Sequence, residues 1–66
     1  MKYTLEVTQC NDVGCRNMIS RKDDAIVQEF HVPLLKIDEA ILQWKQMFTE
    51  EEFAKGTAEV LRHDIN

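Results

Sequence analysis

Glycine and proline are scarce in this chain, and their scarcity excludes several classes of protein. The 66 residues include 2 glycines and 1 proline, so there is neither a flexible linker nor a low-complexity segment. Hydrophobic residues make up 44% of the chain and charged residues 30%, a balance typical of folded proteins rather than disordered ones. We therefore expect one small globular domain that spans residues 1–66.

Long hydrophobic runs are also missing from the sequence. No segment reaches the length of a transmembrane helix, and residues 1–9 alternate in polarity instead of forming the apolar centre of a signal peptide. We therefore expect a cytoplasmic protein with no membrane partner. In that compartment the two cysteines, Cys10 and Cys15, normally stay reduced.

The chain has no excess of positive charge. It carries 8 Lys and Arg residues against 12 Asp and Glu residues, which gives a net charge of −4. Because non-specific affinity for phosphates comes from clustered Lys and Arg, this composition disfavours nucleic acid as the main partner. A protein partner with a basic surface fits the charge better.

Catalytic motifs are missing as well. The sequence contains no glycine-rich phosphate loop, and the three acids at positions 50–52 are explained by the electrostatics of a helix N-terminus. A domain of this size rarely provides the enclosed pocket that an active site needs. We therefore expect neither an enzyme nor a cofactor.

The clearest structural signal in the chain is the segment 34–48, LLKIDEAILQWKQMF. Its large apolar residues share one arc at helical spacing, and no period of two survives across them; they are Leu34, Ile37, Ala40, Ile41, Trp44, Met47 and Phe48. Pro33 precedes the segment and suits the entry to a helix. The pattern predicts a central helix over about 36–47, with Leu35 and Leu42 projecting together on its polar side.

The N-terminal segment predicts a β-hairpin. Residues 2–9 alternate in polarity as a half-buried strand does, and the loop residues 11–14 supply turn chemistry. A four-residue loop would place Cys10 opposite Cys15 and would pair Val7 with Met18 and Leu5 with Ser20.

Two further strands complete a predicted three-stranded sheet. The second strand is expected over about 15–20, and residues 25–32 are rich in β-branched and aromatic side chains. For 25–32 a short helix capped by Asp24 is the alternative, but a strand is favoured because the segment is short and ends before a proline.

The C-terminal third predicts a second helix over about 50–62. Thr49 and Glu52 match a capping box, and apolar residues continue at helical spacing from Phe53 to Leu61. Gly56 lies within this segment and either marks a close approach to the central helix or is merely tolerated. Together the elements predict an α+β fold: a three-stranded antiparallel meander, packed by a central helix and followed by an angled C-terminal helix.

The cysteines and histidines leave three interpretations open. The favoured one is a pair of small reduced residues that flank the hairpin loop. The others are a cross-strand disulfide between Cys10 and Cys15, and a zinc site in which His31 and His63 complete a Cys2His2 set. We assign no metal ligand from the sequence.

These features favour a small acidic regulator or inhibitor that binds a protein partner and forms, in one variant of the hypothesis, a homodimer. The predicted contact residues are a ridge of Leu35 and Leu42 and an acidic patch of Glu50, Glu51 and Glu52. The alternative is a DNA-binding accessory factor that uses a basic sheet surface. Its contact residues would be Arg16, Arg21 and Lys22.

Overall fold

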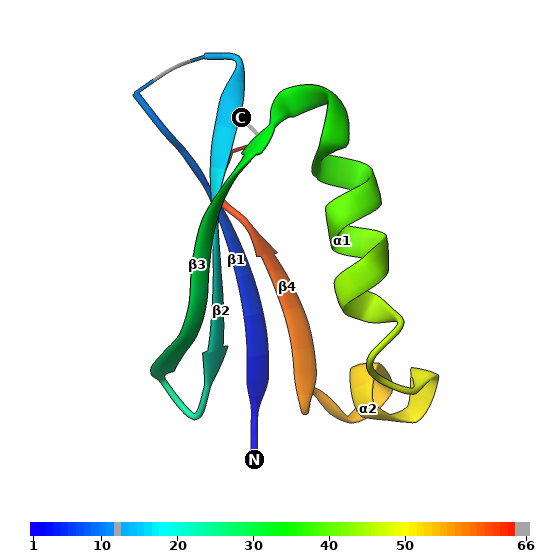
Figure 1. Cartoon of the computed structure of the whole chain (residues 1–66). Coiled ribbons are helices and arrows are strands. Elements are labelled where there is room, and N and C mark those ends of the chain that lie inside the picture. Colours follow the sequence, from blue (N-terminus) through cyan, green and yellow to red (C-terminus); the bar gives the residue numbers. More distant parts are fainter. Residues whose placement is uncertain (12, 65–66) are drawn as a thin grey trace.

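The computed structural model describes residues 1–11 and 13–64. The fold is built on one mixed sheet (Figure 1). The sheet has four strands in the order β3-β2-β1-β4. These are β1 (Tyr3–Gln9), β2 (Cys15–Lys22), β3 (Ala25–Pro33) and β4 (Ala58–Arg62). A 3-10 turn, η1 (Leu34–Lys36), leads from β3 into α1 (Ile37–Lys45), and α2 (Glu50–Lys55) follows. The predicted α+β fold and its antiparallel meander are confirmed.

The β1–β2 hairpin has the register that the sequence predicts. Val7 faces Met18, and Leu5 faces Ser20. Because alternate residues of a strand point to opposite faces, Leu5, Val7 and Met18 share one face, where each is 0% exposed. The segment 25–32, for which a helix was the alternative, is part of strand β3.

Helix α1 supplies the other half of the core. Ile37, Ile41 and Trp44 are buried at helical spacing, and they pack with the buried strand residues in one cluster. The centre of the Trp44 ring lies 4.7 Å from the centre of the Phe48 ring and 6.2 Å from that of the Phe53 ring. These aromatic contacts join α1 to the segment that follows it and to α2.

The C-terminal segment begins as predicted and then leaves the helical path. The Thr49 hydroxyl oxygen accepts a hydrogen bond from the Glu52 N–H at 3.2 Å, and the Thr49 N–H donates to Glu52 Oε1 at 2.9 Å. This pair is the predicted capping box. The prediction of a helix over 50–62 is wrong beyond Lys55, because Gly56 adopts a left-handed φ of 82° that ends the helix.

Residues after Gly56 form β4, which pairs in parallel with β1. Ala58 and Val60 lie on the helix-covered face of the sheet, opposite Tyr3 and Leu5. A five-residue strand shows only two or three repeats of its period, so the same apolar residues also fit a helical stripe. Local spacing therefore did not distinguish a helix from a strand here.

Gly56 is a helix stop and not a point of close contact. A Cβ atom built at this position meets no atom of the described residues within 4 Å. The interpretation of Gly56 as a close approach to the central helix is therefore wrong, and the conformational freedom of glycine at positive φ explains the residue.

We expect Gly56→Ala to lower the free energy of unfolding by about 1 kcal/mol, because an L-residue in the left-handed region is strained. The space around the position is open, so the change in stability reports the strain of the backbone alone. Urea unfolding followed by circular dichroism measures it. The control is Lys55→Ala, one residue earlier in α2, which should change stability by less than about 0.5 kcal/mol. Equal losses in the two variants would contradict the assignment.

Both helices lie on the same side of the sheet, as Figure 1 shows. The opposite face of the sheet is covered by no helix or strand of the described residues. Within residues 1–11 and 13–64, no helix is long and apolar enough to cross a membrane. The features available for function are therefore the uncovered face of the sheet, its two edges and the outer surface of the helices.

Candidate functional site

The predicted leucine ridge lies at the surface. Leu35 is 96% exposed in η1, and Leu42 is 56% exposed in α1. Leu42 follows the buried Ile41 by one residue and therefore projects away from the core side of α1. Nothing in the described chain covers either side chain, so both are accessible to a partner.

The predicted acidic patch is the first turn of α2, and two of its three carboxylates are already used locally. Glu52 completes the capping box, and Glu51 Oε1 lies 2.8 Å from Lys55 Nζ. Glu50 is exposed and makes no ion pair within the described part of the chain. The helix end thus accounts for Glu51 and Glu52, and only Glu50 is left as a freely available charge.

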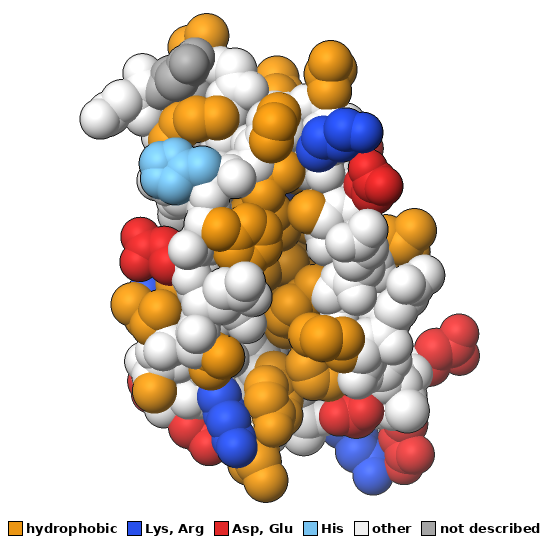
Figure 2. Space-filling model, viewed as in Figure 1, with side chains coloured by type: hydrophobic (Ala, Val, Ile, Leu, Met, Phe, Trp, Pro, Cys, Tyr) orange, Lys and Arg blue, Asp and Glu red, His pale blue; other side chains and the backbone are white. Residues whose placement is uncertain are grey.

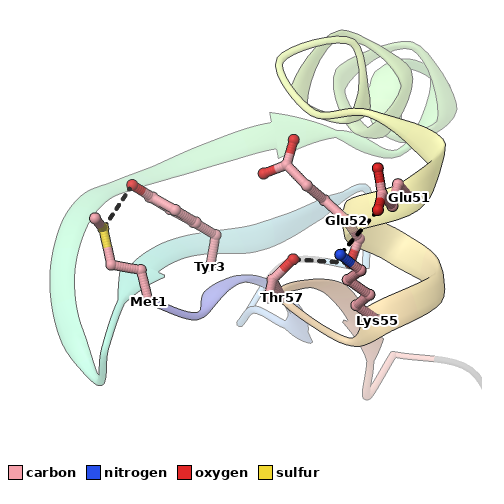
Figure 3. A pocket seen from close by; sticks show the side chains of 6 residues that line it. All are labelled: Met1, Tyr3, Glu51, Glu52, Lys55 and Thr57. Atoms are coloured by element: carbon pink, nitrogen blue, oxygen red, sulfur yellow. Dashed lines mark hydrogen bonds and ion pairs between the residues drawn. The ribbon is translucent and has the colours of Figure 1, made fainter.

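Glu51 and Glu52 also border a surface hollow of ≈ 450 Å³ beside the start of β1 (Figure 3). Its polar groups bind one another. The Tyr3 hydroxyl donates to the sulfur of Met1 at 3.5 Å, and the Thr57 hydroxyl donates to the carbonyl oxygen of Glu52 at 2.9 Å. The polar side chains that line the hollow are thus occupied by contacts within the protein.

The three cations of the DNA-binding alternative do not share one surface. Residues 16 and 22 of β2 lie on the helix-covered face, whereas residue 21 lies on the opposite face. Arg21 Nη1 donates to Glu6 Oε1 at 3.0 Å, and this hydrogen bond lowers the pKa of Glu6. Lys22 lies 5.9 Å from the centre of the Tyr3 ring. The basic sheet surface of that hypothesis is therefore not assembled.

Arg16 is bound to a buried carboxylate. Asp64 Oδ2 accepts hydrogen bonds from Arg16 Nε at 3.2 Å and from Arg62 Nη2 at 3.0 Å, while its Oδ1 accepts from Arg62 Nε at 2.8 Å. The hydrogen bonds from Arg62 hold the pKa of Asp64 below its ordinary value, and the same pair raises the pKa of Arg62. This cluster ties the residues after β4 to β2 and is structural.

The feature that the sequence did not reveal is an open apolar groove beside β3. β3 is an edge strand of nine residues, and no described strand pairs with its outer side. A hollow of ≈ 320 Å³ lies between β3 and α1; it is lined by Gln28, Phe30, Ala40, Gln43, Trp44 and Met47. Figure 2 shows hydrophobic side chains gathered in a band between the sheet and the helix.

Met47 lines this groove because α1 ends earlier than the sequence predicts. The helix stops at Lys45 rather than 47, so Met47 leaves the helical spacing that would have buried it and is 67% exposed. The β-branched and aromatic residues of 25–32 indicated a strand, but the order of strands in the sheet, which makes β3 an edge, is not encoded in any local pattern.

The cysteines and one histidine meet at the opposite face of the sheet. Cys10 and Cys15 form a disulfide, with Cα atoms 6.3 Å apart. The expectation that both stay reduced is therefore wrong in this structure, because the hairpin holds them at a separation that permits a disulfide. The ligand atoms of Cys10, Cys15 and His31 all lie within 4.8 Å of one another. His63 does not join them: its Nε2 lies 3.3 Å from Glu6 Oε2.

Comparison with known proteins assigns neither a family nor a function to this chain. No protein-family model matches the chain, and neither a curated protein nor a solved structure matches it. A function must therefore be inferred from the geometry alone.

Proposed function

We propose that this chain is a small acidic, non-enzymatic protein of the cytoplasm that binds an extended segment of a partner protein at β3 and so regulates or inhibits that partner. The observation that carries the proposal is the open edge of β3 beside the apolar groove. In binding by strand addition, main-chain hydrogen bonds supply affinity and pockets for alternate side chains supply specificity. The outer side of β3 offers main-chain groups that no described strand pairs with, and the groove beside it offers a pocket for side chains.

The pairing stretch of β3 is Gln28–Val32. Closer to the β2–β3 turn the register shifts, since Ser20 faces Gln28 while Arg21 faces Ile26. Such a bulge bends a strand and interrupts its pairing. From Gln28 onward the register is regular, and this stretch also borders the groove through Gln28 and Phe30.

The side chains of this stretch define the chemistry of the partner. Phe30 faces the groove, whose lining includes no charged residue, so the partner residue beside it should be apolar. Glu29 lies on the opposite face, and its carboxylate makes no ion pair with the described residues. A Lys or Arg opposite Glu29 would complete a favourable cross-strand pair. The expected partner segment therefore alternates apolar and basic residues.

A second copy of this chain fits the edge less well. If two β3 strands paired antiparallel about Glu29, two like charges would face each other, which is destabilising. We therefore propose a different protein as the occupant, and we expect the isolated chain to be a monomer. A dimer in sedimentation at high protein concentration would favour the homodimer instead.

The surfaces predicted from the sequence are not part of the binding site in this proposal. Leu35 and Leu42 lie away from the groove, and Glu50 to Glu52 lie on α2. We propose no nucleic-acid role, because Arg16 and Arg21 are ion-paired and lie on opposite faces of the sheet.

The test is a selection of short random peptides on the immobilised protein. We expect the bound peptides to alternate apolar residues with Lys or Arg, and we expect Glu29→Lys and Met47→Glu each to weaken their binding about tenfold, or about 1.4 kcal/mol. The contribution of Glu29 should fall as salt is added.

Two matched controls separate the surfaces. Glu50→Lys makes the same charge change on α2, and Leu42→Glu makes a comparable change on the outer side of α1. Both should leave peptide binding within about twofold of the wild type. If Glu50→Lys weakens binding and Glu29→Lys does not, the acidic patch is the site. If Leu42→Glu weakens binding and Met47→Glu does not, the leucine ridge is the site.

A further inference from the structure

We propose that Cys10, Cys15 and His31 form a zinc site that becomes available when the Cys10–Cys15 disulfide is reduced. The three residues lie on the opposite face of the sheet from the groove, at the end where the β1–β2 hairpin turns.

The three residues come from different elements and meet on one face. Cys15 and residue 17 of β2 share the bare face of the sheet, and His31 of β3 is paired with residue 17. Cys10 directly follows β1 and closes the hairpin opposite Cys15. This convergence is set by the register of two hairpins and not by proximity in the sequence.

The distances fit a metal centre. The ligand atoms of Cys10, Cys15 and His31 lie within 4.8 Å of one another. Zinc binds thiolate sulfur at about 2.3 Å and imidazole nitrogen at about 2.0 to 2.1 Å, which places neighbouring ligands of a tetrahedral site about 3.4 to 3.8 Å apart. The required change is therefore a small movement of side chains once the sulfur–sulfur bond is broken.

Asn17 supplies a second observation at the same place. Its Oδ1 atom is buried and has no hydrogen-bond partner among the described residues. Asn17 faces His31 across the strand pair, and both line a hollow of ≈ 240 Å³ together with Cys10 and Cys15. A histidine that binds metal through one ring nitrogen usually donates its other N–H to an oxygen, and Asn17 Oδ1 is an acceptor available for that role.

A dithiol reductant can convert the disulfide form into the form that binds zinc. The dithiol gives two electrons and two protons to the Cys10–Cys15 bond, which yields two thiols, and the reductant becomes a disulfide. Zinc then displaces the two thiol protons and binds the thiolates together with neutral His31. Water takes the fourth position, since the hollow is open to solvent. In a reducing compartment the metal-bound form is therefore the expected one.

The test is metal binding by the full chain in its two redox states. The protein is reduced under nitrogen, freed of reductant and titrated with Co²⁺, whose thiolate complexes absorb by charge transfer, and Zn²⁺ is then added as a competitor. We expect one Co²⁺ per reduced chain, displacement by Zn²⁺, and no charge-transfer absorption from the oxidised chain.

Variants identify the ligands. Cys15→Ser should abolish the charge-transfer band of a two-thiolate site, His31→Gln should weaken zinc binding by more than tenfold, and Asn17→Ala should weaken it about tenfold. His63→Gln is the matched control and should bind as the wild type does. Circular dichroism verifies that each variant is folded.

Three results would overturn the proposal. One is a reduced, folded chain that binds no Co²⁺ or Zn²⁺. Another is a His31→Gln variant with wild-type affinity, which would restrict the site to the two cysteines. The third is an equal loss in His63→Gln, which would show unspecific binding by histidines.

Discussion

Trp44→Ala is expected to remove most of the stability of the domain. Replacing a buried tryptophan with alanine costs about 3 to 5 kcal/mol, and a domain of this length has about 3 to 10 kcal/mol in total. Trp44 is 8% exposed and contacts the rings of both Phe48 and Phe53. The variant therefore loses packing contacts between α1 and α2 as well as contacts between α1 and the sheet.

Denaturant unfolding followed by circular dichroism measures this loss, since the variant has no tryptophan to report fluorescence. Leu42→Ala, on the exposed side of the same helix, is the control and should change the free energy of unfolding by less than about 0.5 kcal/mol. Ile41→Val provides a milder core change, with an expected loss of about 0.5 to 1.5 kcal/mol. Similar effects of Trp44→Ala and Leu42→Ala would show that α1 packs through a different face.

Asp64→Asn is expected to lower the free energy of unfolding by about 2 kcal/mol at neutral pH, because hydrogen bonds between a buried carboxylate and charged donors are strong. The carboxylate side chain is 3% exposed and accepts from both Arg16 and Arg62. The neutral amide accepts through one oxygen only and leaves the two guanidinium groups without a counter-ion.

The pH dependence of this loss follows from the pKa of Asp64. The folded-state pKa lies below the ordinary value of 3.8, chiefly because of the hydrogen bonds from Arg62. The carboxylate therefore stabilises the folded state fully above the unfolded-state pKa, and its contribution disappears as the pH falls through the folded-state pKa. The difference between the wild type and Asp64→Asn should be constant near pH 7 and should shrink below about pH 4.

Glu59→Gln is the control for a surface ion pair. Glu59 Oε2 lies 3.2 Å from Lys2 Nζ, and both side chains are well exposed. Its removal should cost less than about 1 kcal/mol, and the loss should diminish in high salt. A loss in Asp64→Asn as small as in Glu59→Gln, or one that persists at acid pH, would contradict the role assigned to the buried carboxylate.

The sequence predicted those parts of the fold that local patterns determine. Alternation in β1 and a four-residue loop fixed the pairing of Val7 with Met18, because a shift by one residue would have turned the hydrophobic side chains to solvent. The Thr49 and Glu52 capping box marked the start of α2 because side chain and backbone bind within one turn.

The sequence did not predict β4, because that strand depends on a distant partner. Its residues form a strand by pairing with β1, more than 50 residues earlier in the chain. Gly56 was the available signal: glycine is common just after the last residue of a helix, and Lys55 ends the preceding turn. Reading Gly56 as a helix end would have placed residues 57–62 outside the helix.

The candidate site escaped prediction for the same reason. The sequence drew attention to Leu35 and Leu42, which are exposed as expected, but an open strand edge arises only from the order of all four strands. Met47 was assigned to the core and instead lines the groove. The meeting of Cys10 and Cys15 was predicted from the hairpin, whereas His31 joins them through the β2–β3 register.

Binding at the β3 edge is tested most directly by amide hydrogen exchange, residue by residue, with and without a peptide selected on this protein. We predict that the peptide slows exchange in Gln28–Val32 of β3, at amides that do not bond to β2, because new main-chain hydrogen bonds form there. Exchange around Leu42 and in α2 should stay unchanged. Unaltered exchange in β3, together with slowed exchange around Leu42 or Glu50, would contradict the claim that the β3 edge is the binding site.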